Sequence, residues 1–212
     1  SEPWVDGGME LKLREIDRLL AEMPRHSSVA ITSPEHLVRE LFTHKGFGTL
    51  VQKGVGITRY ESLEKVDTEM LRTLLESSFS RPLDPDYFLR DDIDSIFVAD
   101  DHSAAAIIST GLHTPYLDKF AVTPEAQGAG IGASLWNRVV ADYPALVWRS
   151  QRGNPINPWY FERSDGAIRG PESPWAVFWL GLEELSLIEA CVVDARARKA
   201  SFLEEPAHAC VN

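Results

Sequence analysis

Residues 114–133 constrain the fold more than any other stretch, because a strand-like run, a glycine-rich turn and a helix-like run follow one another there. Residues 116–122 predict a strand, and apolar residues at helical spacing follow the turn. Gly128, Gly130 and Gly132 permit backbone conformations that a side chain forbids. They also leave N–H groups bare at a helix N-terminus, where the helix dipole favours an anion. The stretch predicts a pyrophosphate cradle, with a plain flexible loop as the alternative.

Two sequence patterns fit this turn. Residues 128–133 match G-x-G-x-x-G/A, a weak dinucleotide fingerprint, but the turn follows a hairpin and no acidic residue ends the next strand to hold a ribose. Residues 127–132 match Q-x-x-G-x-G, which resembles the signature of the acetyl-CoA-binding acetyltransferases of the GNAT superfamily. The second match favours coenzyme A over a nicotinamide dinucleotide. It implies cofactor contacts from the turn and the strand before it: Phe120, Ala121, Val122, Gln127, Gly128, Gly130 and Gly132.

The net charge of −11 opposes nucleic-acid phosphates and anionic lipid, so neither is an expected partner. Hydrophobic residues make up 44% of the chain and charged residues 25%, which is ordinary for a soluble globular protein with a sizeable core. Cys191 and Cys210 have no metal-ligand spacing, so we expect no metal and no disulfide framework. We find no signal-like N-terminus and no apolar run of about 18 residues. The chain begins without Met, and we expect it to be cut from a longer protein.

The order of elements predicts an α/β fold. Between residues 55 and 182, strand, helix, strands, helix, strand, helix and strands follow one another, which indicates a mixed sheet in one domain. We expect helices at 8–23, from Pro34 to 41 or 42, at 63–79, from the glycine turn to 142, at 154–162 and at 183–195. We expect strands at 27–32, 55–61, 95–100, 104–110, 116–122, 146–151 and 175–180.

Several further motifs lie in register around the turn. They are Tyr116-Leu-Asp-Lys-Phe120, Trp148-Arg-Ser150, Asn154-Pro-Ile-Asn-Pro-Trp-Tyr160, Ser164-Asp-Gly166 and Phe178-Trp-Leu-Gly-Leu182. Together they cover nearly all of residues 55–185 and resemble the N-acetylglutamate synthase family, in particular its vertebrate-like type and the bacterial bifunctional synthase/kinases. The resemblance implies the GNAT fold, a mixed, mostly antiparallel sheet flanked by helices, over residues 51–195, with residues 196–212 as a tail.

The first fifty residues resemble another domain of those proteins. Gly7-Gly-Met9, Ser27-Ser-Val and Glu40-Leu-Phe-Thr43 are similar to the C-terminal end of the amino-acid kinase domain. The resemblance implies that residues 1–50 are a short α/β remnant of that domain, with a small independent subdomain as the alternative. Most of the kinase domain is absent from this chain, so we expect neither kinase activity nor the arginine site of a complete kinase domain.

Acetyl transfer to glutamate requires cations, because glutamate carries two carboxylates. Arg can hold a carboxylate through two parallel hydrogen bonds, whereas Lys offers a point charge. The candidates are Lys119, Arg149 and Arg81, and the resemblance favours all three, although relatives have Lys at the Arg81 position. A solvated strand-end charge is the alternative for any one of them. Arg152 has no assigned role, since Gln151 stands where some relatives carry a second Arg.

Tyr160 is the expected general acid. A phenol with a pKa near 10 stays protonated at neutral pH and can donate to the departing thiolate. Packing between neighbouring aromatic residues is the alternative. The resemblance also places Asn154 in the glutamate site, where its amide can bond a carbonyl or carboxylate. Strand alternation predicts that Asp118 faces away from Lys119. We identify no obvious base and expect direct attack by the amine, with His113 or water taking its proton.

These residues and the resemblance predict an amino-acid N-acetyltransferase that moves the acetyl group of acetyl-CoA to the α-amine of L-glutamate. The products are N-acetylglutamate and CoA, and the family uses this step in arginine biosynthesis. The alternatives are another small amine as the acceptor, or a non-catalytic acetyl-CoA-binding regulatory domain. The resemblance implies a cytoplasmic protein in bacteria or a mitochondrial-matrix protein in a eukaryote. It also implies that the full-length protein forms a homo-oligomer through its kinase domain.

Overall fold

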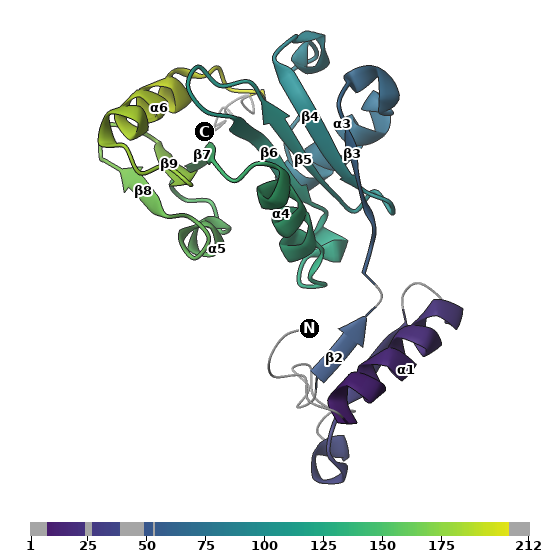
Figure 1. Cartoon of the computed structure of the whole chain (residues 1–212). Coiled ribbons are helices and arrows are strands. Elements are labelled where there is room, and N and C mark those ends of the chain that lie inside the picture. Colours follow the sequence, from purple (N-terminus) through teal and green to yellow (C-terminus); the bar gives the residue numbers. More distant parts are fainter. Residues whose placement is uncertain (1–7, 24–26, 39–48, 53, 204–212) are drawn as a thin grey trace, which may run out of the picture. The chain divides into compact units, whose positions relative to one another are not determined.

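The computed structural model describes residues 8–23, 27–38, 49–52 and 54–203. The chain divides into two compact units, Ser1–Gly54 and Val55–Asn212. Most of their helices and strands are labelled in Figure 1. Part of the predicted kinase-domain remnant and the end of the predicted tail lie outside the described residues.

The first unit holds one helix and a two-stranded antiparallel sheet. Helix α1 (Gly8–Glu22) buries Ile16 and Leu20 on one side, as its helical periodicity predicts. Strand β1 (Ser28–Ile31) pairs with β2 (Thr49–Gln52), a strand that the sequence does not predict. The helix predicted from Pro34 begins as the 3-10 turn η1 (Pro34–His36), and its predicted end lies outside the described residues.

The second unit is built on a seven-stranded sheet with the order β3-β4-β5-β6-β7-β9-β8. The strands are β3 (Ile57–Tyr60), β4 (Ile93–Ala99), β5 (Ala104–Ser109), β6 (Tyr116–Val122), β7 (Leu146–Gln151), β8 (Gly166–Arg169) and β9 (Trp175–Leu180). All neighbours are antiparallel except β6 and β7, so the predicted α/β class with a mixed, mostly antiparallel sheet is confirmed. The sequence does not predict β8, because its four residues show no alternation of buried and exposed positions.

Helices cover both faces of this sheet. Alternate residues of the central strands pack against α3 (Thr68–Phe79) and α6 (Leu185–Ala197) on one face, and against α4 (Ile131–Asp142) and α5 (Asn157–Phe161) on the other. The predicted helix over residues 63–79 is interrupted, because the Asp67 carboxylate caps α3 by accepting from the N–H groups of its first turn. Among the described residues, no helix combines the length and the apolar character needed to cross a membrane.

Short 3-10 turns connect several of these elements. They are η2 (Leu63–Lys65), η3 (Tyr87–Leu89) and η4 (Pro124–Ala126). After α6, residues 198–203 return to the body of the unit, and we call them the C-terminal strap. The strap is hydrogen-bonded to residues 82–84, and the ring of Phe202 lies 4.7 Å from that of Phe79. The first part of the predicted tail is therefore packed against the rest of the second unit.

A β-bulge in β6 positions the candidate site. Lys119 pairs with Ile107 and Leu117 pairs with Ile108, so Asp118 is an extra residue with no partner on β5. On its other side β6 is paired with β7 at a single position, Tyr116 opposite Val147. Beyond that position the two strands diverge, and the glycine turn follows β6.

Candidate active site

The glycine turn leaves several backbone donors without acceptors. Gly128 and Gly130 have φ values of 85° and 83°, a conformation that L side chains rarely adopt, and Gly130 is the N-cap of α4. Among the described residues, nothing accepts from the N–H groups of Gly130, Ile131 or Gly132. A methyl group placed on Gly128 or Gly130 would project into open space. The turn can therefore cradle an anionic group at the helix N-terminus.

A cavity of about 440 Å³ adjoins this turn, and we call it the turn cavity. It is lined by Ser78, Phe79, Phe120, Ala121, Val122, Ala126, Gln127, Gly128, Gly132, Asn154, Pro155, Ile156, Trp159 and Tyr160. The structure therefore brings together every predicted cofactor residue except Gly130, together with the two predicted catalytic residues. Gly130 belongs to the same turn and is itself the N-cap of α4.

Tyr160 combines a buried ring with an unpartnered hydroxyl. The side chain is only 6% exposed, and its ring contacts those of Phe120, Trp148 and Phe178. The hydroxyl makes no hydrogen bond with any described residue, although Tyr160 lines the turn cavity. Burial, and then the neighbouring Tyr116, raise the pKa of Tyr160 above its usual value. Tyr160 is thus both a packing aromatic and a protonated donor beside the cavity.

Asn154 and Ser78 present further polar groups to the turn cavity. The Asn154 side-chain oxygen accepts from the Ile156 N–H at 3.2 Å, while its amide nitrogen donates to no described residue. The Ser78 hydroxyl is buried and has no partner among the described residues. Ser78 and Phe79 are not among the predicted site residues, because the end of α3 appears in the sequence only as the end of a helix. Trp159, on α5, is also not among them. A buried donor without an acceptor fits a bound carbonyl or amide group.

The predicted glutamate ligand Lys119 is buried in an ion pair on the face of the sheet that α3 covers, and it does not line the turn cavity. Its Nζ lies 2.8 Å from Asp118 Oδ2, 3.0 Å from the Asp118 carbonyl oxygen and 2.8 Å from Ser201 Oγ in the strap. The prediction that Asp118 faces away from Lys119 is wrong, because the bulge interrupts the alternation. Asp118 also accepts from Arg90 at 3.1 Å and from the Tyr87 hydroxyl.

Burial and neighbouring charges shift the pKa values of both Asp118 and Lys119. Burial alone would raise the pKa of Asp118, but Lys119 and Arg90 outweigh burial and lower that pKa to about 2. Burial lowers the pKa of Lys119, and Asp118 partly offsets this effect. All three ammonium protons of Lys119 have acceptors, so this cation is not open to a ligand in the present arrangement.

Arg149 is held by the end of α6 and the strap. Its guanidinium donates to the carbonyl oxygens of Ala195 at 2.8 Å, Arg196 at 3.3 Å and Lys199 at 3.0 Å. It also lies 4.1 Å from the ring of Trp175, and burial lowers its pKa. The third predicted cation, Arg81, is half-buried and forms no side-chain hydrogen bond or ion pair with a described residue.

Tyr116 lies between the two groups of candidate residues. It is buried at the start of β6, and the guanidinium of Arg198 lies 4.0 Å from its ring. Burial raises the pKa of Tyr116, whereas the nearby Arg149 opposes the rise. The same phenol raises the pKa of Tyr160. Tyr160 and Arg149 therefore flank one buried tyrosine, from opposite faces of the sheet.

A cavity beside unpartnered N–H groups at a helix N-terminus is typical of a binding site for an anionic coenzyme or nucleotide. Residues 58–198, more than half of the chain, match the family described as "NAT, N-acetyltransferase, of N-acetylglutamate synthase". The chain belongs to this family of N-acetyltransferase domains. Together with the sheet order, this membership identifies the fold as the GNAT fold that the sequence predicts.

Individual relatives extend over most of the chain. An acetylglutamate kinase from Xanthomonas campestris is 42% identical over 207 residues, covering 95% of this chain and 48% of that protein. The mitochondrial N-acetylglutamate synthase of Homo sapiens is 41% identical over 204 residues, covering 94% of this chain and 38% of that protein. The chain thus spans about half or less of the length of these curated relatives.

One solved structure is a looser match. The N-acetylglutamate synthase from Neisseria gonorrhoeae, complexed with coenzyme A and N-acetyl-glutamate, is 19% identical with a TM-score of 0.45. The similarity covers 70% of this chain and 40% of that chain.

Proposed function

We propose that the second unit transfers the acetyl group of acetyl-CoA to the α-amine of L-glutamate, giving N-acetylglutamate and CoA. The observation that carries this proposal is the turn cavity, where turn N–H groups and the hydroxyls of Ser78 and Tyr160 all lack partners among the described residues. Family membership supports acetyl transfer, and the names of the two relatives support glutamate chemistry.

The wider setting follows from the same proposal. The reaction belongs to arginine biosynthesis, in the cytoplasm of a bacterium or in the mitochondrial matrix of a eukaryote. The full-length protein would form a homo-oligomer through its kinase domain. The proposed step requires no metal ion.

The residues of the turn cavity fit coenzyme A. The pyrophosphate would accept from the N–H groups of Gly130, Ile131 and Gly132, where the dipole of the 12-residue helix α4 favours negative charge. The rest of the coenzyme would run beside Phe120, Ala121 and Val122 of β6. The Ser78 hydroxyl would supply a hydrogen bond to one of its carbonyl groups.

The proposed chemistry is direct attack. The neutral amine of glutamate forms the new C–N bond as the C–S bond of the thioester breaks. Tyr160 gives its proton to the departing thiolate, and the amine loses a proton that returns to Tyr160 through water. The raised pKa of Tyr160 keeps this proton in place until the thiolate forms. Orientation of the two substrates and polarisation of the thioester supply the remaining acceleration.

Lys119 and Arg149 would hold the carboxylates of glutamate, and both must exchange partners to do so. Lys119 would release Ser201, and Arg149 would release carbonyl oxygens at the end of α6 and in the strap. The exchange is favourable because a carboxylate accepts more strongly than a hydroxyl or a neutral carbonyl. Arg81 precedes the residues that bind the strap and would be the third cation, and Asn154 would bond the substrate from the cavity side.

The occupied cations favour one other function. If the strap does not release Lys119 and Arg149, the unit would bind acetyl-CoA without accepting glutamate, as a regulatory domain would. The turn cavity would then bind acetyl-CoA, and Lys119 and Arg149 would bind no substrate.

Release of free thiol from acetyl-CoA separates these functions. We expect release that depends on L-glutamate, with other amino acids and a polyamine as controls. Release with a different amine would retain the coenzyme and discard glutamate. Binding of acetyl-CoA with no release under any condition would instead identify the regulatory domain.

A further inference from the structure

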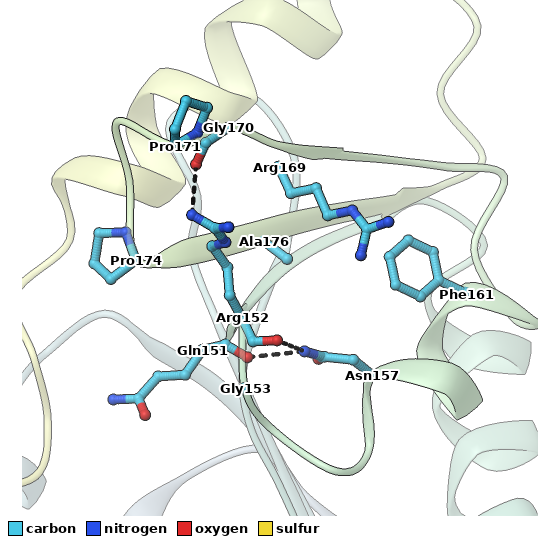
Figure 2. Close-up of a pocket in the computed structure, with 10 residues that line it drawn as sticks. All are labelled: Gln151, Arg152, Gly153, Asn157, Phe161, Arg169, Gly170, Pro171, Pro174 and Ala176. Carbon is cyan, nitrogen blue, oxygen red and sulfur yellow. Dashed lines mark hydrogen bonds between the residues drawn. The ribbon is translucent and has the colours of Figure 1, made fainter.

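A second and larger cavity lies on the other side of the loop that presents Asn154. It measures about 810 Å³ and shares no lining residue with the turn cavity. Its walls are the end of β7 with the following loop, α5, and the turn between β8 and β9 (Figure 2). We call it the outer cavity.

Two guanidinium groups line the outer cavity without an acidic partner. Arg152, at the end of β7, donates to the carbonyl oxygen of Gly170 at 3.1 Å. Arg169, at the end of β8, lies 5.3 Å from the ring of Phe161. Neither forms an ion pair with any described residue, and no carboxylate is among the lining residues. The neighbouring Glu172 is paired with Arg196 at 3.3 Å. Two such cations are notable in a chain with a net charge of −11.

Asn157 adds an unsatisfied polar atom. Its side chain is 7% exposed, and its amide nitrogen donates to the carbonyl oxygens of Gln151 at 2.8 Å and Arg152 at 3.1 Å (Figure 2). Its side-chain oxygen is buried and has no partner among the described residues. A buried acceptor of this kind is costly unless an N–H or O–H group reaches it.

The remaining wall is largely apolar. Phe161, Pro171, Pro174 and Ala176 contribute to it, and the volume exceeds what one inorganic anion would fill. Two guanidinium groups on different elements each match one planar carboxylate, and an apolar wall suits a short hydrocarbon chain between two carboxylates.

We propose that the outer cavity binds a small dicarboxylate that carries a hydroxyl or amino group. Arg152 and Arg169 would each hold a carboxylate, and the hydroxyl or amino group would donate to the Asn157 oxygen. This site is distinct from the proposed glutamate site, because neither Lys119 nor Arg149 lines the outer cavity. It is nevertheless adjacent, since Tyr160 and Phe161 are consecutive and line the turn cavity and the outer cavity respectively.

Calorimetric titration of the whole chain with L-malate tests the proposal, with saturating CoA present to occupy the turn cavity. We expect malate to bind, and its Kd to rise at least about tenfold in the double variant Arg152→Gln/Arg169→Gln. Arg14→Gln/Arg18→Gln removes the same charge from exposed positions in the first unit and should leave the Kd unchanged. Both pairs are on the surface, and retained CoA binding shows that the variants fold.

Three further titrations sharpen the result. Succinate lacks the hydroxyl of malate and should bind several-fold more weakly if the Asn157 oxygen takes part; equal binding would remove Asn157 from the site. Inorganic phosphate should bind much more weakly than malate, and equal binding would reduce the cavity to a general cation patch. If Arg149→Lys abolished malate binding while Arg152→Gln/Arg169→Gln still bound malate normally, malate would bind at Arg149 and the proposal would be overturned.

Discussion

The two sides of the proposed active site differ in how their polar groups are satisfied. On the turn side, the N–H groups of the glycine turn and the hydroxyls of Ser78 and Tyr160 lack partners among the described residues. On the opposite side, Lys119 forms three hydrogen bonds and so uses all its ammonium protons, and the guanidinium of Arg149 forms three more with carbonyl oxygens. The turn side is therefore already arranged for a ligand, whereas the opposite side must first give up internal contacts.

This difference bears on the energetics of binding. A preformed site spends little free energy on rearrangement, so acetyl-CoA should bind the free protein without a change in the strap. Glutamate must displace hydrogen bonds of similar number to those that it forms, so its net affinity is the smaller quantity. The following predictions test each side separately, from the largest expected effect to the smallest.

The largest effect is expected on the turn side, at Tyr160. Tyr160→Phe removes the proposed acid and should lower kcat by about 10²–10⁴-fold, with little change in either KM. In the wild type, the raised pKa keeps the phenol protonated, so Tyr160 should cause no fall in kcat below pH 10. Steady-state kinetics over a range of pH measure both effects. Tyr60→Phe is the matched control, and a normal kcat in Tyr160→Phe would exclude the acid role.

Arg149 should give the next largest effect, on the opposite side. Arg149→Lys keeps the charge but loses the forked geometry, so the KM for glutamate should rise about 10–100-fold. The KM for acetyl-CoA should stay within about twofold, because the turn cavity is untouched. Arg138→Lys, on the exposed side of α4, is the control. A parallel rise in both KM values would contradict a role in binding the carboxylates.

Lowering the pH should destabilise the protein by protonating Asp118, the partner of Lys119. The folded-state pKa of about 2 lies below the usual value of 3.8, so the ion pair contributes stability above pH 4 that is lost as the pH falls toward 2. We expect a loss of roughly 2 kcal/mol in unfolding free energy over this window. Denaturant unfolding at several pH values measures the loss. Asp118→Asn should remove this part of the acid dependence, and an unchanged dependence would show that other carboxylates cause it.

Gly130 should give a smaller effect, again on the turn side. Ala at a φ of 83° is strained by about 1–2 kcal/mol, so the KM for acetyl-CoA should rise about tenfold in Gly130→Ala. The KM for glutamate should change little. Gly54→Ala, at a position with open space and no positive φ, is the control. Equal effects on both substrates would argue against a cradle specific for the coenzyme.

Ser201 should give the smallest effect. Ser201→Ala removes one acceptor that competes for Lys119, so the KM for glutamate should fall by up to about threefold. Ser186→Ala, whose hydroxyl donates to Glu184, is the control on α6. A higher KM would mean that Ser201 positions Lys119 and does not compete with the substrate.

The turn side was the more predictable one because its signal is local. Gly128 and Gly130 stand in the turn that needs a positive φ, and the strand before it supplies the cavity wall. The α/β class and most helices and strands also follow from periodicity within short windows. These features depend on residues that are neighbours in the chain.

The opposite side depends on contacts between distant residues. Ser201 accepts a hydrogen bond from Lys119, 82 residues earlier in the chain. The carbonyl oxygen of Lys199 accepts one from Arg149, 50 residues earlier. No pattern within residues 196–212 shows this return, so the sequence predicts a tail. The bulge cannot be predicted from the sequence either. The residues from Tyr116 to Val122 fit a regular strand as well as they fit a strand with Asp118 as an extra residue.

The bulge gives β6 one residue more than its ladder with β5 needs. Removing Asp118 would leave Leu117 opposite Ile108 and Lys119 opposite Ile107, as they are now, but in an unbroken ladder. The strand would lose the bend that accompanies a bulge, and its later half could lie alongside β7, with which it now pairs at one position. A single extra residue therefore accounts for the early separation of two parallel strands, and the proposed coenzyme site lies at the end of β6, beyond their one paired position.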